Sequence, residues 1–397
     1  MTSLGLGATK KLRDICKIIG GKPAPQDDSA FSKQGIPFVR MKDVGKYHQT
    51  NNLVNIEDSI SPEWAQKNGY VPLRPGCILL PRSGSVALNH RAILGVDAVI
   101  VSHLCALEVI DNQVVYTPYL YWYLCGINFE KFTKKTTGLD AINFSDLGEV
   151  TIYLPSLDEQ QRIAVMLDKA DAILRKCKES LNISDDLLRS IFLEMFGDPV
   201  SNSMSWDEKP IGELSTVTTG NTPSREVLEY YGDFIEWIKS DNINTAGHYL
   251  TKSKEGLSET GAKVGRKVSA GSTLITCIAG SPSCIGNAAL ADRTVAFNQQ
   301  INALTPKNDI EPQFLYCCIL FSKKRIQAAS TSGMKGMVSK GVLEQVRLIC
   351  PPKPKREAFV RIFEKNISMQ KALQLSQQES EKLFASLSSQ SFPDITK

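Results

Sequence analysis

The sequence lacks most of the patterns by which an enzyme or a metal protein is recognised. Its ten cysteines form no C-x-x-C pair, and none of its four histidines has a second ligand at a useful spacing, which argues against zinc. No G-x-x-x-x-G-K-[ST] loop occurs, and no strand is followed by a G-x-G-x-x-G turn. Cys350-Pro351-Pro352-Lys353 lacks both ends of the Asp/Asn-Pro-Pro-aromatic motif of adenine methyltransferases. We therefore expect no catalytic, cofactor-binding or metal site in this chain.

Long apolar runs, a leader peptide and a strong charge are also missing. No run approaches the roughly 18 apolar residues of a membrane helix, and Met1 to Asp14 has no apolar core of a signal peptide. Most cysteines lie in apolar runs, as reduced core residues do. The net charge of +4 neither requires nor excludes a polyanionic partner. We expect a cytoplasmic protein that does not contact a membrane.

An internal repeat is present instead. Residues near the middle of the chain match residues near its end at an offset of 196, and residues near the start match at an offset of 199. The matches include Ser190/Ser386, Phe196/Phe392, Asp198/Asp394, Pro155/Pro351, Gly21/Gly220, Phe38/Trp237, Arg40/Lys239 and Val44/Ile243. Such a tandem duplication predicts two similar units related by a pseudo-two-fold internal repeat.

Each half begins with a mixed segment and continues with a long helix. Short apolar runs such as Cys77–Leu80 and Val346–Cys350, separated by Gly- and Pro-rich turns, indicate strands, while Pro118–Cys125 and Pro312–Phe321 indicate helices. The pattern predicts an α+β fold, with mixed domains over 1–155 and 197–352 and long helices over 156–196 and 353–392. Ser156 and Glu159 form a capping-box pattern at the first helix start.

Both long helices carry an apolar seam with heptad spacing, which favours packing of the two helices on each other as a coiled coil. The expected seam residues are Ile163, Leu167, Leu174, Leu181, Leu188 and Ile191 in the first helix, and Phe359, Ile362, Met369, Leu373, Leu383 and Leu387 in the second. Ile173, Ile183, Phe192 and Ile367 are expected on the outward faces, where they would leave apolar surface for a partner.

The mixed segments offer basic and amide residues in turn-rich loops at matching points of both halves. Arg, Lys, Asn and Gln can read base edges, while Lys, Ser and Thr hold phosphates. Each residue alone is more often a solvated surface group, and the hypothesis rests on the recurrence. The candidates are Lys22, Arg40, Lys42, Arg82, His90, Arg91, Lys134, Lys135 and Asn143 in the first half, and Asn221, Lys239, Asp241, Asn242, Arg293, Asn298, Gln299, Lys335 and Lys340 in the second, together with the run 323–325.

These features resemble the specificity (S) subunit of type I restriction–modification systems over nearly the whole chain. The most specific segments are Leu154-Pro155-Ser156-Leu157-Asp158-Glu159-Gln160-Gln161-Arg162 at the entry to the first helix and Glu194-Met195-Phe196-Gly197-Asp198-Pro199 at its exit. Leu12 to Pro23, Ile211 to Pro223 and Trp237 to Ile243 resemble the starts of target-recognition domains. The second helix departs from the pattern, because Lys353 to Phe359 lacks the Gln-containing entry.

The resemblance implies two tandem target-recognition domains, each reading one half of a bipartite, asymmetric double-stranded DNA target. It further implies that the two helices pair antiparallel as a spacer. Two modification (methyltransferase) subunits that methylate adenine would bind along the helices, and restriction (motor–nuclease) subunits would join them. S-adenosylmethionine, ATP and Mg²⁺ would be bound by those partners.

Two other interpretations remain open at this point. One is a two-headed protein-interaction scaffold with the same coiled coil and no DNA binding, which a salt-dependent DNA-binding measurement would separate from the first. The other is a Mg²⁺-dependent nuclease, because Asp198 followed by Asp207-Glu208-Lys209 meets a loose nuclease pattern. The residues alone give neither the DNA target nor the spacing of its halves.

Overall fold

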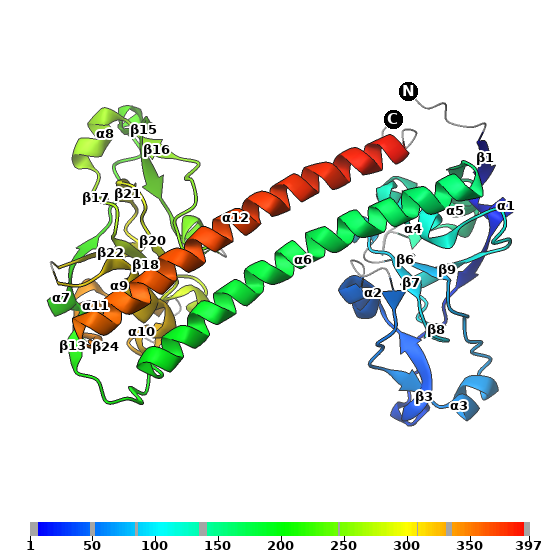
Figure 1. The fold of residues 1–397 in the computed structure, drawn as a ribbon, viewed down its shortest axis with the longest axis horizontal. Helices are drawn as coiled ribbons and strands as arrows, with labels where there is room; N and C mark the ends of the chain where they lie inside the picture. The colour runs from blue at the N-terminus through cyan, green and yellow to red at the C-terminus, as the bar shows by residue number, and fades with distance from the viewer. Residues whose placement is uncertain are drawn as a thin grey trace. The chain divides into compact units, whose positions relative to one another are not determined.

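The structure is a computed structural model that describes residues 7–47, 52–83, 86–134, 141–244, 247–307, 309–330 and 336–392. The chain forms two compact units, Met1–Glu179 with Gln374–Lys397, and Ser180–Leu373. Two long helices, α6 (Leu157–Phe196) and α12 (Lys353–Ser391), each run without a break from one unit into the other (Figure 1). Each unit thus contains one end of both helices.

The first unit contains two main sheets and two strand pairs. The larger sheet has the order β2 (Cys16–Gly20), β9 (Leu104–Val109), β6 (Ile78–Pro81), β7 (Ala92–Leu94), β4 (Asn52–Leu53), and the smaller has the order β5 (Ser59–Ile60), β3 (Phe31–Val39), β8 (Val99–Ile100). The pairs are β1 (Ala8–Lys11) with β12 (Thr151–Leu154) and β10 (Thr133–Lys134) with β11 (Ala141–Ile142). The helices are α1 (Leu12–Ile15), α2 (Met41–Tyr47), α3 (Pro62–Lys67), α4 (Thr117–Gly126) and α5 (Phe144–Gly148), with 3₁₀ turns η1 (Asp28–Ala30), η2 (Val86–Leu88) and η3 (Phe129–Phe132).

The second unit repeats the strand order of both sheets except at one edge of each: among the described residues the equivalent of the larger sheet ends at the counterpart of β7, and the equivalent of the smaller sheet gains the strand β17 (Lys267–Val268). Its sheets have the orders β14 (Ser215–Thr219), β22 (Ile301–Pro306), β18 (Thr273–Thr276), β20 (Ala288–Leu290) and β16 (Gly256–Leu257), β15 (Tyr231–Ile238), β21 (Val295–Phe297), β17 (Lys267–Val268). The pairs are β13 (Glu208–Pro210) with β24 (Arg347–Ile349) and β19 (Ile278–Ala279) with β23 (Gly336–Met337). The helices are α7 (Ile211–Leu214), α8 (Glu259–Val264), α9 (Pro312–Phe321), α10 (Lys323–Ala328) and α11 (Lys340–Gln345), with η4 (Leu228–Tyr230), η5 (Ser240–Asn242) and η6 (Pro282–Cys284).

The repeat extends to a glycine that each unit needs at the same place. A Cβ on Gly21, after β2, would lie 2.0 Å from the Val101 carbonyl oxygen, and one on Gly220, after β14, would lie 2.1 Å from the Asn298 carbonyl oxygen. Only glycine permits such an approach of two backbones. The predicted α+β fold with an internal repeat is confirmed by this shared topology.

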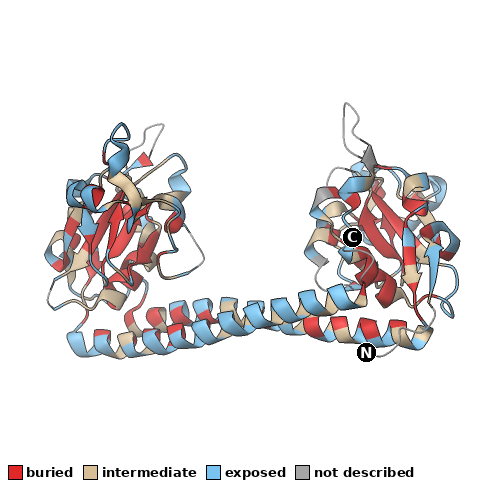
Figure 2. Cartoon of the chain, turned by 90° about the horizontal axis from the view of Figure 1, so that it is seen from above, coloured by how far each residue is buried: buried red, intermediate tan, exposed pale blue. Residues whose placement is uncertain are grey.

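The largest core cluster of each unit contains one buried helix. Tyr119 and Leu124 of α4 are fully buried in the first unit, as Phe314 and Ile319 of α9 are in the second. Both helices are apolar on all sides, which is typical of a helix enclosed by protein. Figure 2 shows the buried residues concentrated in the sheets and along the parts of the long helices that pack on each unit.

The starts of α6 and α12 are fixed by different residues at the same repeat position. Gln160 is buried, donates to the carbonyls of Val114 and Pro155, both at 3.0 Å, and accepts from the Tyr116 N–H at 2.8 Å. Arg356, 196 residues later, donates to the Pro351 carbonyl at 2.8 Å and pairs with Glu311 at 2.7 Å. The missing Gln of the second helix is therefore replaced by an arginine that bonds to the equivalent proline carbonyl.

The long helices run antiparallel within each unit. In the first unit the Cys177 sulfur contacts the Ser376 hydroxyl at 3.8 Å. In the second, the Asn366 amide donates to the Ser184 hydroxyl at 2.9 Å, and the ring centres of Phe192 and Phe359 lie 5.3 Å apart. From Ser184 to Phe192 the residue numbers rise along α6 while those of the contacted residues fall from Asn366 to Phe359 along α12, and this confirms the antiparallel pair. Amide and hydroxyl groups in such a seam fix its register.

The observed seam differs in phase from the predicted one in the second helix. Ile163, Leu167, Leu188 and Phe359 are buried, and Leu174, Leu181, Ile191, Ile362, Leu373 and Leu387 are partly buried. Met369 and Leu383, in contrast, are 45% and 52% exposed. The residues that follow them lie in the seam instead: Gln370 is buried, and the ring of Phe384 contacts Trp122. The prediction was wrong there because adjacent apolar residues made the phase ambiguous and a polar glutamine occupies the seam.

The outward apolar residues also need a correction. Ile173 and Ile183 are exposed as expected, but Phe192 is fully buried among Phe314, Phe321 and Phe359, and Ile367 is buried in the same cluster. The exposed apolar side chains of the long helices are Val165, Ile173, Ile183 and Leu187 on α6, and Met369, Leu375 and Leu383 on α12.

Candidate nucleic-acid interface

The basic candidates that follow β3 in the first unit are neutralised by nearby carboxylates. Arg40 pairs with Asp58, and Lys42 pairs with Glu57 at 3.0 Å. The hydrogen bond from Lys42 holds the pKa of Glu57 below its ordinary value. The Asp43 carboxylate accepts the Arg40 backbone N–H at 2.7 Å and fixes this turn. Cations already paired in this way gain less from a phosphate, because the carboxylate repels it.

The equivalent turn of the second unit has the same construction. The Lys239 backbone N–H donates to the Asn242 side-chain oxygen at 3.0 Å, which matches Arg40 and Asp43 in the repeat. The Lys239 ammonium pairs with Glu255, and Arg225 pairs with the same carboxylate at 2.9 Å. Asn242 is buried and donates to the Lys252 carbonyl at 3.2 Å. Asn242 therefore shapes this turn.

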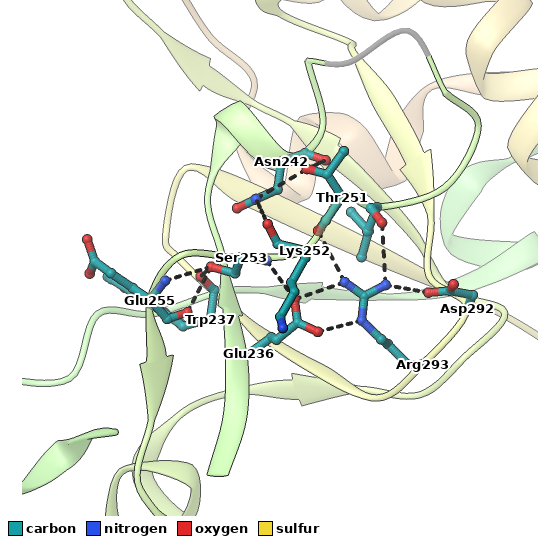
Figure 3. Close-up of polar contacts among 10 residues, drawn as sticks. Glu236, Trp237, Asn242, Thr251, Lys252, Ser253, Glu255, Asp292 and Arg293 are labelled. Carbon is teal, nitrogen blue, oxygen red and sulfur yellow. Dashed lines mark hydrogen bonds and ion pairs between the residues drawn. The ribbon is translucent and has the colours of Figure 1, made fainter. Parts of the chain in front are cut away.

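Arg293 lies at the centre of a polar network in the second unit (Figure 3). Its guanidinium forms a two-point pair with Glu236 at 2.7 and 2.9 Å and a further pair with Asp292 at 2.5 Å. Glu236 also accepts the Ser253 backbone N–H at 2.6 Å. The hydrogen bond to Glu236 raises the pKa of Arg293, and the same bond lowers the pKa of Glu236. The network ties β15 to the loop that follows β20, so Arg293 acts within the fold.

Arg91 is enclosed by the first unit, and the prediction that it contacts DNA is wrong. The residue is 1% exposed, its guanidinium lies 4.6 Å from the Phe129 ring centre, and it donates to the His90 carbonyl at 2.6 Å and to the Asn89 side chain. Burial lowers its pKa to about 10. Arg91 is the last residue of the loop between β6 and β7, and its buried guanidinium stabilises the part of that loop that carries His90.

The other candidates of the first unit have varied surroundings. Lys22 donates to the Asn68 carbonyl at 3.2 Å and lies 5.2 Å from the Tyr70 ring centre. Arg82 lies 4.6 Å from the Phe144 ring centre, and His90 is partly exposed. Asn143 caps α5 by accepting the Ser145 N–H. The backbone of Lys134 belongs to β10, and Lys135 lies outside the described residues.

The remaining candidates of the second unit are mostly used by the fold. Asn221 accepts the Arg266 backbone N–H at 2.7 Å and donates to the Val264 carbonyl at 2.9 Å. Asn298 is buried, and its side chain bonds to Gln300. Gln299 accepts from the Thr222 hydroxyl, and Lys340 lies 3.7 Å from Glu344. Asp241 is exposed, and Lys335 lies outside the described residues.

Sequence reasoning selected the cations and missed their acidic partners. A signal for those partners was available, because acidic residues stand near matching places of the repeat: Asp58 pairs with Arg40, and Glu255 pairs with Lys239. It also missed Asn244 and Asn287, two amides that bond to each other at 2.6 Å. These amides line an open hollow of about 500 Å³ in the second unit, together with His248, Asp185 and Arg189.

Asp198, the first residue of the nuclease pattern, stabilises a turn. The Asp198 carboxylate accepts the Val200 N–H and the Ser201 hydroxyl, both at 3.0 Å, and these bonds lower its pKa. Within the described ranges, no group of three or more His, Cys, Asp and Glu side chains is placed to hold a metal ion. Asp198 therefore stabilises the turn that follows α6, and its surroundings do not support the nuclease interpretation.

Comparison with known proteins decides the family. The type I restriction modification DNA specificity domain matches this chain twice, over residues 8–183 and 204–383. The chain belongs to this family. The resemblance inferred from its helix-entry and helix-exit segments is therefore confirmed, and the two matched ranges agree with the two halves of the repeat.

Three curated members of the family are similar to part of the chain. The MjaIX specificity subunit of Methanocaldococcus jannaschii is 24% identical over 55% of this chain and 54% of its own length. The HindI specificity subunit of Haemophilus influenzae is 28% identical over 41% of this chain and 36% of its own length. The EcoR124I/EcoR124II specificity subunit of Escherichia coli is 27% identical over 43% of each. The matches thus span about half or less of these relatives.

Solved structures share the fold along the whole chain. The type I restriction–modification S subunit from M. genitalium superposes with a TM-score of 0.62 at 15% identity, covering 98% of this chain and 96% of that one. A chain from a study of complex assembly in the type I restriction–modification system gives a TM-score of 0.57 at 14% identity, covering 99% of both. In the part of this chain that the structure describes, no helix is long and apolar enough to cross a membrane.

Proposed function

We propose that this chain is the DNA-recognition subunit of a type I restriction–modification complex. In this proposal each half reads one half of a bipartite, asymmetric double-stranded DNA target. The observation that carries the proposal is the DNA specificity domain, present twice and joined by two unbroken helices. The two halves share their backbone plan but differ in loop residues, such as His90 where the second half has Asn287, so the two half-sites should differ in sequence.

In this proposal the chemistry takes place on partner subunits. Two modification subunits carry S-adenosylmethionine and methylate adenine, and motor–nuclease subunits supply ATP- and Mg²⁺-dependent cleavage. This chain directs them and catalyses nothing itself, and the complex works in the cytoplasm. The surroundings of Asp198 agree with this division of labour, because its carboxylate bonds to Val200 and Ser201 in a turn.

The long helices would bind the modification subunits. Ile173 and Ile183 on α6 are 49% and 58% exposed, and Leu375 and Leu383 on α12 are 62% and 52% exposed. Apolar side chains repeated along exposed helices are typical of a surface that a partner covers. We expect the complex to contain one copy of this chain and two modification subunits, and the chain alone to aggregate.

A DNA-binding measurement with the assembled complex tests the proposal against the scaffold alternative. The complex of this chain with its modification subunits should bind duplex DNA, and the logarithm of the binding constant should fall steeply with the logarithm of salt concentration, because phosphate contacts release counterions. Modification subunits without this chain are the control. A complex that assembles but shows no salt-dependent DNA binding would leave the scaffold as the better description.

A further inference from the structure

Lys323, Asn287 and Asn244 form a hydrogen-bonded series in the second unit. The Lys323 ammonium, on α10, donates to the Asn287 side-chain oxygen, and the Asn287 amide nitrogen donates to the Asn244 side-chain oxygen at 2.6 Å. Asn287 precedes β20 and Asn244 follows η5, so the series connects three segments far apart in the sequence. Both hydrogen bonds join side chains, so neither belongs to the backbone bonding of a helix or a sheet.

The direction of every bond in this series is fixed by the lysine. An ammonium group only donates, so the oxygen of Asn287 must face Lys323 and its NH₂ group must face Asn244. Asn244 then receives that bond on its oxygen, and its own NH₂ group points away from Asn287. Because Asn244 is exposed, this NH₂ group is presented to whatever binds there.

The equivalent place in the first unit has different chemistry. Gly45 corresponds to Asn244 at the offset of 199. His90 corresponds to Asn287 by strand register, because each stands two residues before the strand residue, Ala92 or Ala289, that pairs with the equivalent neighbouring strand. A Cβ on Gly45 would lie 3.1 Å from His90 Nδ1, so the imidazole packs against the glycine and no amide series forms. The supporting cation is Arg91 in the first unit, next to His90 in sequence, whereas Lys323 comes from a separate helix in the second. The two units share the loop and differ in what it presents.

We infer that the Lys323–Asn287–Asn244 series orients a base-reading amide for the second half-site of the DNA, an inference that rests on the proposed function. An outward NH₂ donor matches the major-groove acceptors of guanine, adenine and thymine, whereas cytosine presents a donor there. The contacted position should therefore exclude cytosine. Asp185, Asp186 and Arg189 line the same hollow as the two amides, so its two carboxylates and one guanidinium give it no excess of positive charge to attract a phosphate. Lys323 and Asn287 are positioning residues, and Asn244 contacts the base.

Lys324 provides a matched control on the same helix. It is the exposed neighbour of Lys323, so Lys323→Met and Lys324→Met remove the same charge and donor while only the first breaks the series. Each variant, together with Asn244→Ala, is expressed with its modification subunits, and the methylated motif is mapped across a genome. Unchanged assembly and an unchanged first half-site show that the complex is folded.

The expected result is a change of specificity at one position. Wild type should exclude cytosine at one position on the strand that Asn244 contacts in the second half-site, and Lys323→Met and Asn244→Ala should reduce that discrimination by roughly ten-fold. Lys324→Met should leave the motif as in wild type, because a lysine that contacts only phosphates carries no sequence information, and its loss would lower methylation equally at all sites. If both lysine variants lower methylation equally at all sites, the lysines serve only as charges and the inference is overturned. An unchanged motif in all variants overturns it too, whereas a wild-type complex without a bipartite motif would instead refute the proposed function.

Discussion

Gln160 and Arg356 occupy equivalent positions at the starts of α6 and α12, and both are buried. Gln160 uses both ends of its amide, donating to the Pro155 carbonyl and accepting the Tyr116 N–H. Arg356 can only donate, so the acceptor role is lost and Glu311 supplies a countercharge instead. Burying an arginine requires this pairing, because an unpaired buried charge costs several kcal/mol.

We predict that Arg356→Met destabilises the second unit by about 3–5 kcal/mol, because Glu311 is left without its partner. The measurement is hydrogen exchange of the amides at the start of α12 and in α9. Arg361→Met, an exposed position on the same helix, is the control and should change little. The double variant Arg356→Met with Glu311→Gln should recover part of the loss; a double variant as unstable as the single one would contradict the pairing account.

His248 should make the second unit sensitive to mild acid. It lies 3.0 Å from the Tyr316 hydroxyl and 3.3 Å from Asp185. Burial lowers its pKa below the ordinary value of 6.5, with the Asp185 carboxylate opposing that shift. The unfolded chain then binds a proton that the folded unit does not, so stability is full above about pH 6.5 and declines as the pH falls below it.

Urea denaturation of the complex with its modification subunits across pH 5 to 8, followed by a probe in the second unit, measures this effect. The midpoint should fall on the acidic side for wild type, and the part due to His248 should disappear in His248→Asn. A variant with the same pH profile as wild type would show that His248 is not the source of the sensitivity.

At the scale of elements, the hydrophobic pattern of the long helices predicts where each helix lies but not which of its faces forms the seam. The existence and extent of both helices followed from spacing, capping and the Gly197 stop. The phase of the second seam did not, because the polar Gln370 lies inward while the apolar Met369 and Leu383 face outward. A count of apolar positions does not predict polar contacts across the seam, such as the hydrogen bond from the Asn366 amide to the Ser184 hydroxyl.

The corrected phase predicts opposite outcomes for two adjacent residues. Phe384→Ala should destabilise the first unit by about 2–3 kcal/mol, because its ring contacts Trp122 and its removal leaves a cavity. Leu383→Ala should change the stability by less than about 0.5 kcal/mol, because Leu383 is exposed. Thermal unfolding of the two variants compares them directly, and equal losses would restore the originally predicted seam.

The candidate interface shows a similar limit. Residue type and recurrence pointed to the loops, but single side chains could not be ranked, because a cation's partner in space is far away in sequence. Arg293 and Glu236 are 57 residues apart, and Arg40 and Asp58 are 18 apart. Burial separates Arg91 from exposed cations such as Lys324, and the sequence around Arg91 gives no sign of it.

At the scale of the whole molecule, duplication is the feature from which the account follows. The repeat in the sequence, the shared sheet orders and the two matches to the DNA specificity domain all divide the chain into the same two halves. Each half has its own core around α4 or α9, so the loops of one half can change without affecting the core of the other. The central claim is that one half reads one half-site.

Exchange of one half tests that claim most directly. Residues 1–155 would be replaced by the corresponding segment of a related specificity subunit, and the methylated motif of the chimera with its modification subunits would be mapped by genome sequencing. Because base contacts are local, the account predicts that one half-site changes to that of the donor while the other half-site stays as in the parent. A chimera that assembles and methylates DNA with both half-sites changed, or with neither changed, would contradict the assignment of one domain to one half-site.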